Sequence, residues 1–93
     1  MSVSIHIPTP LRPYTDGQTT VEVSGDTVGD ALGQLTASHP DLARHLRDDS
    51  GKLRSFVNVY LGDEDIRFLD AEDTLVDNGD ELTIVPSIAG GSR

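Results

Sequence analysis

Apolar and polar residues alternate in four stretches of the chain, and a period of two is typical of half-buried strands. The alternation predicts strands over residues 3–7, 20–24, 56–61 and 81–85. In the first stretch Val3, Ile5 and Ile7 face one way, whereas Ser4 and His6 face the other. We expect the first two strands to form an antiparallel hairpin with a long loop.

Residues 28–38 show helical spacing instead, and they predict the main helix. Its apolar positions are Val28, Ala31, Leu32 and Leu35. Asp26 and Thr27 precede this run, and either residue suits the N-cap position. Pro40 suits the first turn of a second, short helix over residues 41–47.

Two glycines interrupt the main helix. Gly29 and Gly33 lie four residues apart on one side of it. A glycine inside a helix costs up to ~1 kcal/mol relative to alanine. We therefore expect a close approach of the helix to a sheet to compensate.

The segments between these elements carry turn residues. Residues 8–18 contain three prolines and an Asp-Gly pair, which predict an ordered turn region rather than a helix or a strand. Residues 62–65 predict a hairpin turn that returns through a short edge strand over 66–68. Residues 71–76 predict a tight turn in which Leu75 and Val76 contact the core.

The predicted elements suit one α+β domain, with the first hairpin and the final strand in one sheet and the main helix across its inner face. Alternation then places His6, Asn58, Tyr60 and Val85 on the outer face. Tyr60 and Val85 make this face partly apolar, which indicates a candidate docking surface. Single exposed apolar residues are also ordinary on a sheet, so both interpretations stand.

Composition narrows the class of protein. The chain has 93 residues, of which 35% are hydrophobic, enough for a single small core. Sixteen acidic residues against seven basic ones give a net charge of −9, which disfavours nucleic acid and anionic membranes as partners. The chain has no apolar run of membrane-spanning length and no signal-peptide pattern at its start, so we expect a cytoplasmic protein.

The residues give little support to a catalytic or metal site within the domain. Cysteine is absent, which excludes disulfides, thiolate ligands and a cysteine nucleophile. His39 and His45 do not have the spacing of a metal-ligand pair. No local signature marks a serine nucleophile. We therefore expect no metal, no intrinsic cofactor and no enzymatic activity.

The last seven residues form a segment of different character. Apolar periodicity stops at Pro86, and residues 87–93 include the consecutive glycines Gly90 and Gly91. We divide the chain into a domain over residues 1–86 and a flexible tail over 87–93. One interpretation of the tail is a frayed terminus. The other is a peptide thin enough to enter a partner's active site, since glycine has no Cβ to clash there.

The order of elements and several short motifs resemble one family over essentially the whole chain. The motifs are Ile7-Pro8-Thr9, Leu11-Arg12-Pro13, Gly17-Gln18, residues 56–60, Asp65-Ile66-Arg67-Phe68 and the ending from Asn78 to Gly91. The chain resembles the MoaD/ThiS family of ubiquitin-like sulfur carriers, and within it the CysO-type carriers. The resemblance implies a β-grasp fold, with a mixed sheet of four to five strands packed on one main helix.

The resemblance also implies a chemistry centred on the tail. An ATP-dependent activating enzyme of the ubiquitin-activating (E1-like) type would adenylate the carboxylate of Gly91, and sulfur would convert it to a thiocarboxylate. Ile88, Ala89, Gly90 and Gly91 would enter the partner's active site, with Ile88 as an apolar anchor. The sulfur would go to a second enzyme, and CysO-like features favour a pyridoxal-phosphate-dependent cysteine synthase. Molybdopterin, thiamin and tRNA thiolation stay open as alternative pathways.

The chain departs from the family at its end, because mature carriers end at the second glycine. Here Ser92 and Arg93 follow, so the Gly91 carboxyl is an amide. Either a protease cuts between Gly91 and Ser92, for which the family suggests a JAB1/MPN-type metalloprotease, or the dipeptide is a cloning remnant. Two other functions stay open. They are a ubiquitin-like modifier joined through Gly91 to lysines, and a plain interaction domain.

Overall fold

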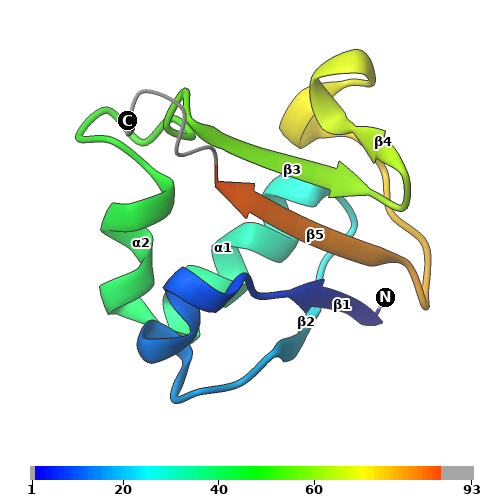
Figure 1. The fold of residues 1–93 in the computed structure, drawn as a ribbon. Helices are drawn as coiled ribbons and strands as arrows, with labels where there is room; N and C mark the ends of the chain where they lie inside the picture. The colour runs from blue at the N-terminus through cyan, green and yellow to red at the C-terminus, as the bar shows by residue number, and fades with distance from the viewer. Residues whose placement is uncertain (1, 87–93) are drawn as a thin grey trace.

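The computed structural model describes residues 2–86, which form a five-stranded sheet with its helices on one side (Figure 1). The strands are β1 (Ser2–His6), β2 (Thr20–Ser24), β3 (Val57–Leu61), β4 (Glu64–Asp65) and β5 (Glu81–Pro86). Their order across the sheet is β2-β1-β5-β3-β4. The pairing of β1 with β5 is parallel, and the other three pairings are antiparallel. The four strands predicted from alternation are thus confirmed to within one residue at each end.

The main helix α1 (Val28–Ser38) has the predicted bounds and lies across the inner face of the sheet (Figure 1). Thr27 is its N-cap, and the Thr27 Oγ1 accepts a hydrogen bond of 3.1 Å from the Asp30 N–H. A second helix, α2 (Pro40–Leu46), follows directly. The buried core joins the two helices to the inward side chains of the strands, including Ile5, Leu32, Leu35, Leu42, Leu82 and Ile84.

The first long connection contains a helix that the sequence did not predict. Residues Thr9–Thr15 form a 3₁₀ helix within the segment expected to hold only turns. Thr15 is fully buried, and its Oγ1 lies 3.1 Å from both the Arg12 and the Gln18 carbonyl oxygens. Pro10 and Pro13 fix φ at values compatible with helical turns. The hydrogen bonds of Thr15 hold the end of the segment in place.

The expected edge strand over 66–68 is wrong. The hairpin turn at Gly62 and Asp63 returns through β4, which consists only of Glu64 and Asp65, and Ile66–Phe68 is a 3₁₀ helix. The Asp65 carboxylate accepts a hydrogen bond of 2.9 Å from the Arg67 N–H. This cap turns the chain away from the sheet after two paired residues.

The prediction that Leu75 and Val76 both contact the core holds for Val76 alone. Val76 is 4% exposed, whereas Leu75 is 74% exposed. Leu75 forms an isolated antiparallel bridge with Thr27, and the Val76 N–H donates to the Asp26 carbonyl at 3.0 Å. The segment is therefore extended, and consecutive side chains point to opposite sides.

The expected approach of the helix glycines to the sheet is also wrong. A Cβ on Gly29 would meet the Glu72 carbonyl oxygen at 3.1 Å, and Glu72 belongs to the 3₁₀ helix Ala71–Asp73 rather than to a strand. A Cβ on Gly33 would meet no atom within 4 Å among the described residues. Gly29 thus lets α1 pack closely against this 3₁₀ helix, and Gly33 has no packing role among the described residues.

Candidate functional site

The central strand β5 leads to the end of the described region. It lies between β1 and β3, and its last residue, Pro86, pairs with Val57 of β3. A proline is tolerated at a strand end because it need not donate a ladder hydrogen bond there. The predicted tail residues Ile88, Ala89, Gly90, Gly91 and Ser92 lie outside the described residues, as does the predicted cleavage position.

The four residues of the candidate docking face come together on the outer side of the sheet. Thr83 of β5 is flanked by His6 of β1 and Tyr60 of β3, and Val85 is paired with Asn58. Val85 is 41% exposed, and the other residues are half-buried. We call this surface, His6, Asn58, Tyr60, Thr83 and Val85, the outer face.

A polar pair borders the outer face on its β1 side. The His6 Nε2 lies 2.5 Å from the Glu81 Oε1, and the His6 Nδ1 lies 3.3 Å from the Thr20 Oγ1. Both ring nitrogens of His6 thus have partners that hold the imidazole against the sheet. This side of the face is polar, and the side near Val85 is more apolar.

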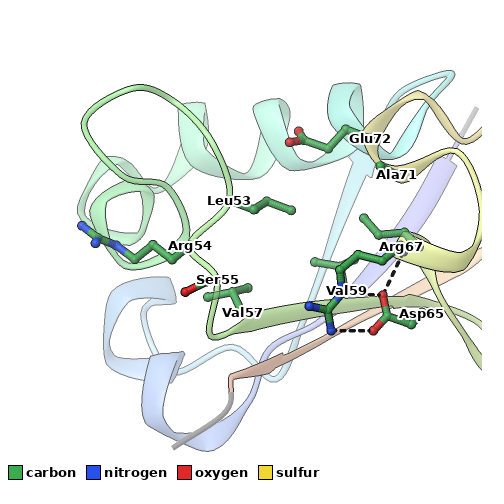
Figure 2. A pocket seen from close by; sticks show the side chains of 10 residues that line it. Leu53, Arg54, Ser55, Val57, Val59, Asp65, Arg67, Ala71 and Glu72 are labelled. Carbon is green, nitrogen blue, oxygen red and sulfur yellow. Dashed lines mark hydrogen bonds and ion pairs between the residues drawn. The ribbon is translucent and has the colours of Figure 1, made fainter. Parts of the chain in front are cut away.

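Sequence reasoning missed Arg67, which borders the outer face at its β3 edge. Asp65, only 7% exposed, accepts hydrogen bonds from the Arg67 Nε at 3.3 Å and the Arg67 Nη2 at 2.9 Å (Figure 2). The same Nη2 also donates to the Asn58 Oδ1. Hydrogen bonds from Arg67 hold the pKa of Asp65 below its usual range, and Asp65 in turn raises the pKa of Arg67.

The result is a fixed cation beside Asn58, with 61% of the Arg67 side chain still exposed. An arginine held in place by a buried carboxylate keeps its remaining N–H groups oriented for an incoming acceptor. The sequence signal that could have revealed this arginine is the Asp-x-Arg spacing of Asp65 and Arg67, which begins one residue after the hairpin turn at Gly62 and Asp63. Assigning Arg67 to a strand obscured it.

A small cavity lies behind this edge of the sheet, between β3 and the segments 53–55 and 65–72 (Figure 2). It measures about 210 Å³. Val57, Val59 and Ile66 provide apolar walls, and Asp65 and Glu72 lie at its margin. Glu72 is already paired with Arg47, at 2.6 Å between Oε1 and Nη2. Ser55 is the one hydroxyl among the lining residues, and no histidine lines the cavity to act as its base.

Within residues 2–86, no three side chains of His, Asp or Glu converge to hold a metal ion. No helix in this region is both long and apolar enough to cross a membrane. What the geometry does present is a surface: a central strand that leads to the tail, an outer face beside that strand, and a fixed arginine at its edge.

Comparison with known proteins shows which family and which relatives this chain resembles. The ThiS family matches residues 5–91 of the chain. A protein named sulfur carrier protein CysO from Mycobacterium tuberculosis is 46% identical over 93 residues, covering 98% of this chain and all of the relative. Small archaeal modifier protein 1 from Haloferax volcanii is 39% identical over 72 residues, covering 76% of this chain and 78% of the relative.

Solved structures agree with the fold. The crystal structure of Mycobacterium tuberculosis CysO superposes with a TM-score of 0.84 and 44% identity, covering 92% of this chain and 99% of that one. A complex of BexX and CysO from Amycolatopsis orientalis gives a TM-score of 0.86 and 40% identity over 96% of this chain and 99% of that one. The predicted β-grasp fold is therefore confirmed, with five strands in the mixed sheet.

Proposed function

We propose that this protein is a sulfur carrier, because it belongs to the ThiS family, whose match reaches from residue 5 to residue 91. In this proposal the protein is of the CysO type, and the Gly91 carboxyl carries the sulfur as a thiocarboxylate. It acts as a co-substrate for other enzymes rather than as a catalyst.

The observation that carries the proposal is similarity over the full length to a protein named as a sulfur carrier. It holds at 46% identity over 98% of this chain. The family match also includes Gly90 and Gly91, so it covers the proposed reacting group as well as the fold.

The proposed chemistry begins with activation, because a carboxylate is a poor electrophile. A Gly91 carboxylate oxygen attacks the α-phosphorus of ATP, and pyrophosphate leaves. A sulfide-level nucleophile then attacks the carbonyl carbon, and AMP leaves with the bridging oxygen. The resulting thiocarboxylate presents an anionic sulfur to the acceptor substrate, and ATP and the sulfur donor come from the activating system.

The length of the tail fits delivery into a channel. Residues 87–91 span at most ~17 Å when extended. The absence of side chains on Gly90 and Gly91 suits a narrow passage, and Ile88 would anchor the tail. We propose that the body of the protein meanwhile docks through Tyr60, Val85, His6 and Asn58 on the outer face.

The Gly91 carboxyl must be free before it can be activated. Because Ser92 follows Gly91 in this chain, we propose cleavage between these two residues by a metalloprotease of the JAB1/MPN type. The freed carboxylate is then the substrate of an E1-like activating enzyme.

For the sulfur acceptor we propose cysteine biosynthesis through a pyridoxal-phosphate-dependent synthase, which follows the similarity to CysO. A related carrier has been solved in a complex with a protein named BexX. That precedent supports direct docking of the present chain on a partner protein.

A second candidate function is protein modification. Small archaeal modifier protein 1 from Haloferax volcanii has a solved structure that superposes with a TM-score of 0.85 and 33% identity over 98% of this chain. The same Gly91 adenylate would be attacked by a lysine Nζ to give an isopeptide bond. Both functions share the activation step and differ in the nucleophile.

ATP–pyrophosphate exchange tests the activation step. The protein ending at Gly91 is mixed with the activating enzyme of its own cell, beside the protein ending at Arg93. We expect exchange with the Gly91 form alone, and sulfide should then convert that form to a thiocarboxylate detectable by mass. Equal exchange with both forms, or with neither, would contradict the proposal.

A further inference from the structure

A second surface feature lies at the point where the chain leaves the sheet. It is a hollow of about 350 Å³ lined by Leu11, Arg44, His45, Arg54, Phe56 and Pro86. We call it the root hollow, because Pro86 is the last described residue before the tail. Its lining residues come from the end of β5, from α2, from the connection between α2 and β3, and from the 3₁₀ helix Thr9–Thr15.

The floor of the root hollow is apolar and partly open. Leu11, Phe56 and Pro86 contribute carbon surface, and Phe56 is 46% exposed. An exposed phenylalanine beside two other apolar residues is costly to leave in water and favours contact with another apolar group.

The rim of the hollow is cationic in an acidic protein. The chain has 16 acidic residues against 7 basic ones, yet none of the six lining residues is acidic and two are arginines. The Arg54 Nε donates to the Arg44 carbonyl at 2.8 Å, which fixes the guanidinium against the end of α2. Figure 2 shows Arg54 extending away from the cavity behind β3 and toward α2.

The second arginine of the hollow, Arg44, is held only lightly. Arg44 makes one long ion pair of 3.7 Å with Asp41, and both side chains are more than two-thirds exposed. His45 stacks on Tyr14 with 4.1 Å between ring centroids. Such exposed pairs contribute little to stability, so Arg44 can exchange Asp41 for a carboxylate of a partner.

The position of the root hollow, beside the last residue before the tail, determines which partner can contact it. Val85 of the outer face directly precedes Pro86, whereas Pro86 pairs with the inward-facing Val57. The root hollow therefore lies at the same end of β5 as Val85, but on the helix side of the sheet. Under the proposed function, residues 87–91 enter an enzyme's active site. The surface around the mouth of that site must then cover Pro86 and its neighbours.

We infer that the root hollow is a docking site for the activating enzyme. It receives a segment in which one apolar side chain is flanked by aspartate or glutamate. The apolar side chain lies on Leu11, Phe56 and Pro86, and the carboxylates pair with Arg44 and Arg54. The inference rests on the proposed function, because activation of Gly91 is what brings the activating enzyme to this end of the protein.

Charge reversal with a matched control tests the inference. Arg44→Glu, alone and together with Arg54→Glu, is compared with Lys52→Glu. This control makes the same charge change as the single variant, at an exposed residue outside the hollow. The readout is the KM for the Gly91-ending protein in ATP–pyrophosphate exchange with the purified enzyme, at low and high salt. We expect KM to rise at least about tenfold for the double variant and less than about twofold for Lys52→Glu.

Several outcomes separate the explanations. A double variant with unchanged KM overturns the inference and leaves the proposed function intact, whereas no exchange with the wild-type protein overturns both. Circular dichroism shows whether loss of the hydrogen bond from Arg54 to the Arg44 carbonyl unfolds the double variant. If it does, the single variant Arg44→Glu still tests the inference. Two results would show that the protein itself occupies the hollow, and either would make the inference wrong. In the first, removal of residues 87–93 shifts the NMR signals of His45 and Phe56 in the absence of a partner. In the second, Arg44→Glu dissociates a dimer in sedimentation.

Discussion

At the scale of single residues, Asp65 explains how the outer face acquires a fixed charge. Its buried carboxylate accepts one hydrogen bond from the Arg67 backbone and two from the Arg67 side chain. The backbone bond ends β4 and begins the next 3₁₀ helix, and the side-chain bonds hold the guanidinium beside Asn58. One residue therefore fixes both the local fold and the edge of the candidate docking surface.

Removing this carboxylate should reduce stability in a pH-dependent way. Asp65→Asn loses charge-assisted hydrogen bonds, and we expect a loss of about 1–3 kcal/mol in the free energy of unfolding at pH 7. Because hydrogen bonds from Arg67 lower the folded-state pKa of Asp65, its contribution is complete above the unfolded pKa of about 3.9 and disappears as pH falls through the folded pKa. Urea unfolding at pH 7 and at the lowest pH that keeps the fold should show the difference shrinking. A difference independent of pH would contradict this role.

At the scale of elements, α1 shows that one glycine pattern can have two causes. Gly29 is crowded by the Glu72 carbonyl, whereas a Cβ on Gly33 would meet open space among residues 2–86. The sequence presents both as equivalent positions four residues apart. Only the placement of the 3₁₀ helix Ala71–Asp73 over one end of α1 distinguishes them.

Alanine at each glycine tests this distinction. Gly33→Ala should raise the free energy of unfolding by about 0.5–1 kcal/mol, because alanine is the better helix former and no atom obstructs its methyl group. Gly29→Ala should gain clearly less, since its methyl group would press on the Glu72 carbonyl at 3.1 Å. Thermal and urea unfolding of both variants supply the comparison. Equal gains would show that the contact with Glu72 does not matter.

The sheet as an element carries a prediction for binding. Val85→Asp places a charge on the more apolar side of the outer face, at a side chain that is already 41% exposed. We expect the midpoint of unfolding to change little and the affinity for the activating enzyme to fall at least about tenfold. Calorimetric titration measures the affinity, and Glu22→Gln on the edge strand β2 is the control. Unchanged affinity for Val85→Asp would remove the outer face from the interface.

Elements with a regular period could be predicted from the sequence, and those set by single contacts could not. Alternation located four strands and the outward residues His6, Asn58, Tyr60 and Val85, because a buried face requires that pattern. The assignment failed at residues 66–68, where the Asp65 cap overrides a strand-like composition. It also failed at Leu75, where a single bridge to Thr27 turns the side chain outward. Arg67 and the root hollow depend on residues distant in sequence, so no local pattern revealed them.

At the scale of the whole molecule, the features proposed to bind partners gather around the end of β5. The outer face, Arg67 and the root hollow surround the strand that leads to residues 87–91. With a net charge of −9, the protein as a whole favours basic partners, whereas the root hollow is the place for acidic side chains. Such an uneven charge distribution helps to orient the approach of a partner as well as to hold it.

The central claim is that the Gly91 carboxyl carries sulfur, and the intact mass of the protein isolated from its native cell tests it most directly. The account predicts a chain without Ser92 and Arg93 in which one oxygen is replaced by sulfur, and alkylation of that sulfur by iodoacetamide should confirm its position. Covalent adducts of Gly91 with other proteins, without any sulfur-containing form, would support the modifier function instead. A chain that still carries both residues, with unmodified mass under sulfur-limited and sulfur-replete growth, would contradict the claim.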